Sequence, residues 1–193
     1  MADGEQITPE QREVELVPHN PEWSQLADEE AKRILERLSI PVIGVYHIGS
    51  TSIPGIKAKP ILDFVIEVEN LDDIIRSTEM LGELGYISRG EYGIPGRQFF
   101  TKDTDNERSH HLHIFQQGHP DIERHLVFRD FLRANPEAAH KYEVIKEKLA
   151  KRFPKESGSY TEAKSDFILS MDEVARYWLE QNGFQNKPPD PES

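Results

Sequence analysis

The sequence predicts a single α/β domain (α+β in stricter usage), in which helices flank a mixed β-sheet and the C-terminal portion is helical. Two patterns indicate this class: apolar residues recur at helical spacing in some segments, and short continuous apolar runs lie between them. The length of 193 residues suits one domain with a proper core. The predicted order of elements is α-β-β-α-β-β-β-α-α-α.

The first part of the chain is predicted to supply the whole sheet. A helix starting at Pro21 has apolar residues at helical spacing up to Leu38, and strands follow at 42–48 and 60–68. The second strand is apolar at nearly every position, which is typical of a strand covered on both faces. The remaining elements are a helix over 71–84 and strands over 86–88, 98–102 and 110–116.

The second part is predicted to form three helices. The first covers 120–132, and the second begins at Asn135-Pro136, a favourable N-cap and N1 pair, and runs to about Phe153. Thr161 is expected to cap the third helix. The inner face of this helix is expected to carry Phe167, Ile168, Met171, Val174, Ala175, Trp178 and Leu179.

The expected organisation is a flexible acidic N-terminus over 1–12, one domain over 13–184 and a disordered tail over 185–193. The N-terminus lacks the basic and apolar regions of a secretory signal, and no apolar run approaches the ~20 residues that span a bilayer. The absence of cysteine excludes disulfides and thiolate metal sites. A cytoplasmic protein without membrane contact is the expectation.

The net charge of −12 argues against a general nucleic-acid binder. Nine acids and one base among residues 1–30 contribute −8 of that charge, so a local basic pocket is compatible with the remainder. The simplest interpretation of the acidic start is a solvated surface, and nothing in it identifies a protein partner.

The most informative segment is the turn that joins the first two strands, His47-Ile48-Gly49-Ser50-Thr51-Ser52. Glycine lets a backbone approach a phosphate closely, and the hydroxyls of Ser50 and Thr51 could donate to its oxygens. Asp63, on the next strand, has no evident structural role and could hold a divalent cation that bridges to the same phosphate. A P-loop is excluded, because no Gly-Lys-Ser/Thr follows at the required spacing.

Four segments, HIGSTSIPGIKAKPILDFVIEV (47–68), HHLHIF (110–115), HLVFRDFLR (125–133) and YTEAKSDFI (160–168), occur in this order. Together they resemble the GrpB family, a branch of the nucleotidyltransferase-fold superfamily, and the likeness extends over about residues 14–180. The resemblance implies a nucleotidyltransferase-like sheet and a predicted transferase activity. It also implies phosphate binding at Gly49 and Ser50, a magnesium or manganese carboxylate at Asp63, and in-line attack with pyrophosphate leaving.

Other residues in the matching segments are candidates for contact with a nucleotide or another phosphorylated small molecule. The guanidinium fork of Arg129 suits phosphate, while Lys59, Tyr160 and Lys164 could project toward the ligand. For each of them the alternative is structural: a solvated lysine, a surface ion pair or packing. The predicted ligand-binding set is Gly49, Ser50, Thr51, Ser52, Lys59, Arg129, Tyr160 and Lys164, with Asp63 and Ser50 as catalytic residues.

The sequence departs from the superfamily at the metal site. A second carboxylate usually stands two residues after the first, and Val65 occupies that position here. Glu67 lies on the same face, but ~13 Å along the strand, whereas paired catalytic metals lie ~3.5–4 Å apart. A protein that retained the fold but acts as a ligand-sensing or partner-binding module is therefore an alternative.

The clustered histidines suggest a third interpretation. In a strand, His111 and His113 point to one face, and with Asp63 they could form a two-His-one-carboxylate site for zinc, manganese or iron. Such a site would suit a metal-dependent hydrolase. Alternatively, these histidines form hydrogen bonds to loops or to the phosphate of a ligand.

Overall fold

The computed structural model describes residues 12–105 and 107–183. Almost all of the predicted flexible N-terminus, and the whole of the predicted tail over 185–193, lie outside the described residues. Arg12 is described, and its Nη2 atom forms an ion pair with Asp103 Oδ2 at 2.8 Å. No helix among the described residues is long and apolar enough to cross a membrane.

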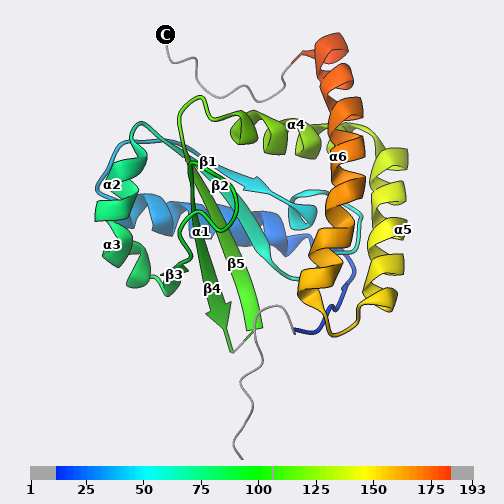
Figure 1. Cartoon of the computed structure of the whole chain (residues 1–193), viewed down its shortest axis with the longest axis horizontal. Helices are drawn as coiled ribbons and strands as arrows, with labels where there is room; N and C mark the ends of the chain where they lie inside the picture. Colours follow the sequence, from blue (N-terminus) through cyan, green and yellow to red (C-terminus); the bar gives the residue numbers. More distant parts are fainter. Residues whose placement is uncertain (1–11, 106, 184–193) are drawn as a thin grey trace, which may run out of the picture.

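Five strands form one mixed sheet in the order β1-β2-β5-β4-β3, so the predicted class is confirmed (Figure 1). The parallel pair is β2 with β5, and the other pairs are antiparallel. Strands distant in sequence therefore meet at the centre. Their bounds are β1 Val42–Ile48, β2 Leu62–Val68, β3 Tyr86–Ser88, β4 Arg97–Thr104 and β5 Glu107–Gln116.

Helices cover both faces of this sheet (Figure 1). One face packs against α1, α2 and α3, and α4 packs against the other. Helices α5 and α6 pack beside α4, where they share a separate apolar cluster. The helices are α1 Glu22–Arg37, α2 Leu71–Arg76, α3 Thr78–Gly82, α4 Pro120–Ala134, α5 Pro136–Arg152 and α6 Ser157–Asn182.

The central strand β2 is buried on both faces, as its continuous apolar sequence predicts. Phe64 and Ile66 join the core beneath α1, together with Trp23. Val65 points the other way, into a cluster with Leu126 of α4. The alternation places Asp63 on the α4 side of the sheet, at the end of β2 that adjoins the turn.

Two helix predictions are wrong in detail. The segment 71–84 forms two short helices, because the backbone at Ser77 (φ −104°, ψ 14°) departs from helical geometry. The last helix begins at Ser157, one turn before the predicted cap, and the Thr161 hydroxyl donates to the Ser157 carbonyl within it. Val174, predicted on the inner face of that helix, is 49% exposed.

Candidate functional site

The turn after β1 is built around Gly49, which has a φ of +70°. A Cβ atom at this position would come well inside 3.0 Å of the Asp63 carboxylate. Glycine thus provides close approach, but toward a protein side chain at the start of β2. A short 3-10 helix, η2 (Ser50–Ser52), follows directly. The turn and Asp63 therefore form one compact unit.

The three hydroxyls of η2 have different roles. Thr51 Oγ1 donates to the Ile61 carbonyl at 3.0 Å, and Ser52 Oγ donates to the Gly49 carbonyl at 2.7 Å. Both side chains are buried, so they stabilise the turn itself. Ser50 is half-buried, and its hydroxyl donates to the Tyr142 hydroxyl at 3.4 Å. Of the predicted phosphate donors, Ser50 is the one left facing the site.

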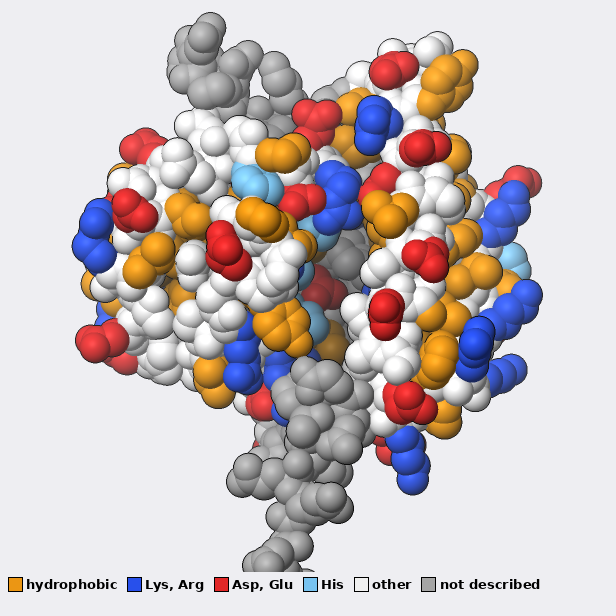
Figure 2. Space-filling view, viewed as in Figure 1, with side chains coloured by type: hydrophobic (Ala, Val, Ile, Leu, Met, Phe, Trp, Pro, Cys, Tyr) orange, Lys and Arg blue, Asp and Glu red, His pale blue; other side chains and the backbone are white. Residues whose placement is uncertain are grey.

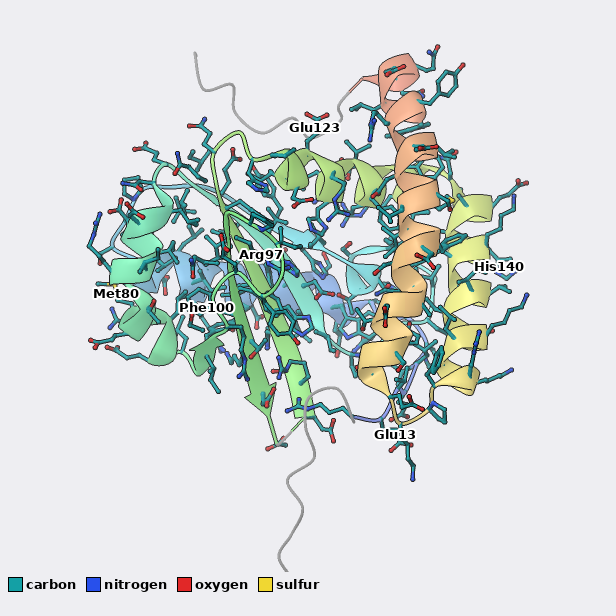
Figure 3. All side chains as sticks on the ribbon, in the orientation of Figure 1. Glu13, Met80, Arg97, Phe100, Glu123 and His140 are labelled. Carbon is teal, nitrogen blue, oxygen red and sulfur yellow. The ribbon has the colours of Figure 1, made fainter. Side chains whose placement is uncertain are left out.

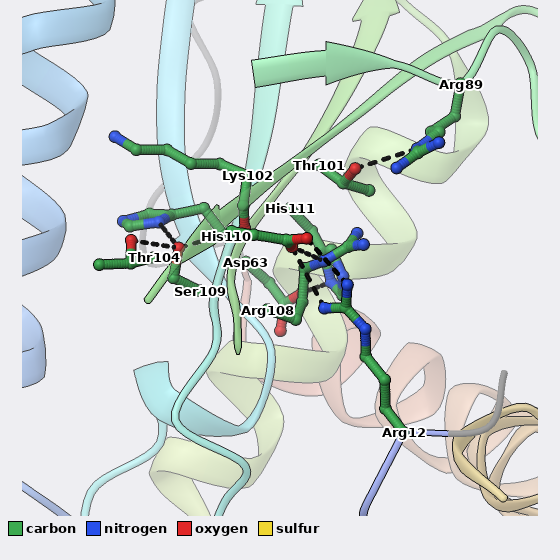
Figure 4. A network of polar contacts seen from close by, with 11 residues as sticks. Arg12, Asp63, Arg89, Thr101, Lys102, Thr104, Arg108, Ser109, His110 and His111 are labelled. Carbon is green, nitrogen blue, oxygen red and sulfur yellow. Dashed lines mark hydrogen bonds and ion pairs between the residues drawn. The ribbon is translucent and has the colours of Figure 1, made fainter. Parts of the chain in front are cut away.

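Asp63 and His111 form the polar pair at the centre of the site (Figure 4). The parallel register of β2 and β5 places them side by side, and His111 Nδ1 donates to Asp63 Oδ1 at 2.8 Å. Each side chain is 25% exposed. Burial alone would raise the pKa of Asp63, but the hydrogen bond from His111 and nearby positive charge lower it. Asp63 is therefore an ionised carboxylate that remains accessible.

Lys59 and Lys164 approach the same region from opposite segments. Their Nζ atoms lie 5.6 and 5.7 Å from the centre of the Tyr160 ring, and Lys59 Nζ also donates to Ser157 Oγ at 2.7 Å. Burial and the charge of Lys164 lower the pKa of Lys59 to about 8. The Tyr142 side chain raises the pKa of Lys164 to about 12. The structure thus brings Lys59, Tyr160 and Lys164 close together; their predicted contact with a ligand stays a prediction.

The sequence reasoning missed Lys146 and Tyr142 of α5. Lys146 is 1% exposed, its ammonium lies 4.8 Å from the centre of the Tyr142 ring, and it donates to the Lys57 carbonyl. Burial lowers the pKa of Lys146 to about 7. Spacing offered a signal, because Ala139, Tyr142 and Lys146 share the apolar face of a helix.

Arg129 lies under the turn and is 5% exposed. Its Nε donates to Asp130 Oδ1 at 2.7 Å, and its Nη1 donates to the His47 carbonyl at 3.1 Å. Arg133 similarly donates to the Ser52 carbonyl at 2.8 Å. Both arginines therefore hold the turn in place through its carbonyl groups.

His113 already has a protein partner at one ring nitrogen. Its Nδ1 accepts from Nη1 of Arg97, at the start of β4, at 3.1 Å. Burial holds the pKa of His113 well below its usual range. Among the described residues, no group of three His, Cys, Asp or Glu side chains is close enough to hold a metal ion. A metal at Asp63 would thus require further oxygens, as from a phosphate or solvent.

The position of the second superfamily carboxylate offers no space for one. Val65 is fully buried between the sheet and α4, in contact with an apolar cluster. Glu67, farther along β2, is 3% exposed and accepts from the Gly118 backbone N–H and from Tyr46. The residues present therefore do not fit a two-metal centre.

The site opens into a hollow on one face of the molecule. Figure 2 shows this hollow between the sheet and α6, with histidine and acidic atoms on its floor. Lysine and arginine side chains gather at its lower end in the same view. The hollow thus combines an acidic centre with a basic margin.

Comparisons with known proteins agree on one family. The model of the GrpB protein family matches residues 13–173. YqkA of Bacillus subtilis is 42% identical over 86% of this chain, which spans only 48% of YqkA. Glutamate-rich protein GrpB of Alkalihalophilus pseudofirmus is 37% identical over 81% of this chain and 92% of its own length.

Solved structures give the same result. The crystal structure of GrpB from Enterococcus faecalis aligns with a TM-score of 0.79 and 35% identity, over 85% of this chain and 99% of that one. Terminal uridylyl transferase 4 of Trypanosoma brucei, solved with bound dUTP, has a TM-score of 0.49 and 14% identity, a likeness that supports no argument about function. The chain belongs to the GrpB family.

Proposed function

We propose that this protein binds a nucleotide or another phosphorylated small molecule, with its phosphates between the Gly49–Ser50 turn and Lys59 and Lys164. A single divalent cation, magnesium or manganese, would bridge the phosphates to Asp63. Transfer of a nucleotidyl group is the reaction that this arrangement would serve. The metal would stabilise negative charge at the phosphate, and the residues of the chain would hold the phosphates in position.

The main support is a group of three lysines, one buried (Lys146) and two half-buried (Lys59 and Lys164), that form no ion pair among the described residues. Within residues 12–105 and 107–183, lysine ion pairs involve Lys32, Lys57 and Lys102, whereas Lys59, Lys146 and Lys164 have none. Lysine charges shielded from water without an ion pair are costly, and the charge of Lys164 repels those of Lys59 and Lys146. A bound phosphate would neutralise them, so the cluster is better explained by a ligand than by stability.

Asp63 is suited to one cation and no more. Its Oδ1 accepts from His111, and the other carboxylate oxygen faces the glycine turn. His111 therefore acts as a positioning residue that orients the carboxylate. With Val65 buried in apolar packing, the cation shell would depend on phosphate oxygens and water.

A second candidate is favoured by Val65 itself. The apolar packing around Val65 leaves no room for a second metal-binding carboxylate. A module that binds the same ligand without turnover therefore also fits this geometry. The two candidates share the phosphate site and differ only in pyrophosphate release.

Isothermal titration with tripolyphosphate and with nucleoside triphosphates, with and without Mg²⁺ or Mn²⁺, tests the proposal. We expect Lys164→Gln to weaken binding at least about tenfold, since a charge-assisted contact contributes about 1.5–3 kcal/mol. Lys141→Gln, on the exposed part of α5, is the matched control and should bind as the wild type does. Asp63→Asn should remove the metal dependence and leave metal-free phosphate binding.

Equal affinity of Lys164→Gln and Lys141→Gln for every ligand would reject the phosphate site. A pyrophosphate-release assay on the wild type then separates a transferase from a binding module.

A further inference from the structure

A cavity of about 310 Å³ lies between the first half of α4 and the second half of α6. Glu123, which marks its place on α4, is labelled in Figure 3. Its apolar lining consists of Pro120, Val127 and Ala175, and its polar lining of Asp121, Glu123, Arg124, Asp172 and Arg176. This mixture suits a flat ligand with a polar edge.

Asp172 is the unusual member of this lining. Its side chain is 7% exposed, and Oδ2 accepts from Arg124 Nη1 at 3.4 Å. Oδ1 is buried and accepts no hydrogen bond in the described structure. Buried acceptors without a partner are rare and costly, so this oxygen calls for a donor from a ligand or water. Arg176, one helical turn later, is exposed and forms no ion pair among the described residues.

A row of neighbouring side chains runs from the proposed phosphate site to the lining of the cavity. His111 and His113 have ring centres 6.5 Å apart, and His113 and His125 have ring centres 5.4 Å apart. Arg124 Nη2 lies 3.2 Å from His125 Nε2, and the same guanidinium reaches Asp172. This row places the cavity beyond His113 and His125 as seen from Asp63, on the side of the sheet that α4 covers.

We propose that this cavity binds a nucleobase that carries an exocyclic amino group, with Asp172 Oδ1 as acceptor and Arg176 as donor. This inference extends the proposed function, because a nucleotide held at Asp63 needs a site for its base. Adenine, guanine and cytosine present an amino donor beside an acceptor. In the uracil base of uridine, the one remaining N–H group lies between two carbonyl groups. The oxygens of these carbonyl groups would be repelled by the Asp172 carboxylate.

Free nucleosides test the cavity without the phosphate site. Ligand-observed NMR would compare cytidine with uridine, and adenosine with inosine, since each pair differs mainly in an amino group against a carbonyl. We expect the amino member to bind at least about tenfold more tightly, because a carbonyl group in place of the amino group cannot donate to Asp172 Oδ1 and leaves this buried acceptor unmatched. Asp172→Asn should reduce this preference to within about twofold, because an amide can offer either an oxygen or an NH₂ group.

Two further variants guard against a folding artefact. Arg176→Gln, on the exposed surface of α6, should weaken both amino nucleosides while leaving the melting temperature unchanged. Glu173→Gln, also exposed on α6, is the matched control and should keep the wild-type preference. Equal binding of amino and carbonyl members, or a preference that survives Asp172→Asn, would overturn the inference.

The two proposals fail separately. Amino-selective nucleoside binding without any tripolyphosphate binding would support the cavity and reject the phosphate site. Tripolyphosphate binding without nucleoside selectivity would reject the base pocket and leave the phosphate site supported. An absence of nucleoside binding at millimolar concentration also rejects the pocket.

Discussion

Replacing Gly49 by alanine should be the most damaging small change in the turn. The residue has a φ of +70° and a ψ of −173°, a combination that residues other than glycine rarely adopt. The new Cβ would also overlap the Asp63 carboxylate. The substitution therefore combines backbone strain with a forced displacement of the central acid.

The two contributions can be separated in magnitude. Backbone strain of this kind costs about 1–3 kcal/mol. Displacing Asp63 breaks its hydrogen bond with His111, and a bond to a charged group contributes about 1.5–3 kcal/mol. We expect Gly49→Ala to lower the free energy of unfolding by about 4 kcal/mol in total, and the melting temperature by about 8–16 °C.

Gly55→Ala is the matched control. Gly55 also has a positive φ, +81°, but no atom lies within 4 Å of the position of an added Cβ. It should therefore show the strain term alone, about 1–3 kcal/mol. Urea denaturation followed by circular dichroism measures both variants. In an Asp63→Ala background the cost of Gly49→Ala should fall by at least about 1 kcal/mol, because the overlapping carboxylate is gone.

Equal destabilisation by Gly49→Ala and Gly55→Ala would refute the reasoning. So would a cost of Gly49→Ala that is unchanged by Asp63→Ala.

Two further predictions concern other charged groups. Phosphate affinity should fall between pH 8 and 9 by up to about tenfold, since the free Lys59 ammonium, with its pKa lowered to about 8, loses its charge as the pH rises. Titration calorimetry of Lys59→Arg should show no such fall, and a fall that persists would contradict this assignment. Glu30→Ala should destabilise the fold by about 2–4 kcal/mol in urea denaturation, because it leaves Lys102 without its buried partner. Glu29 is the preceding residue and is exposed, so Glu29→Ala should lower the free energy of unfolding by under about 0.5 kcal/mol. Similar destabilisation by the two substitutions would contradict the buried role of Glu30.

The helices and strands were largely predictable, because burial imposes periodic patterns on the sequence. The run at 60–68 could be identified as a central strand, since nearly every position must avoid water on one face or the other. The break at Ser77 and the start of α6 at Ser157 were not predictable, because helix ends depend on local contacts more than on periodicity.

The sequence could predict some residues of the candidate site, but not how the site residues are arranged in space. The turn at Gly49 and the acid at Asp63 could be singled out from residue type and order. Their neighbours could not, since Lys146 and Tyr142 come from a helix about 80–95 positions later in the chain. Only the tertiary structure shows that Lys146 is buried without an acidic partner and that Asp172 has an unpartnered oxygen.

The sequence by itself determined the class of fold, the family resemblance and the candidate chemistry of single residues, because those depend on local pattern and composition. The tertiary structure decided which of those residues act together. It paired His111 with Asp63 across parallel strands, assigned His113 to Arg97, and turned Thr51 and Ser52 inward. The physical reason is that hydrogen-bond partners and desolvation are set by neighbours in space, which sequence separation does not reveal.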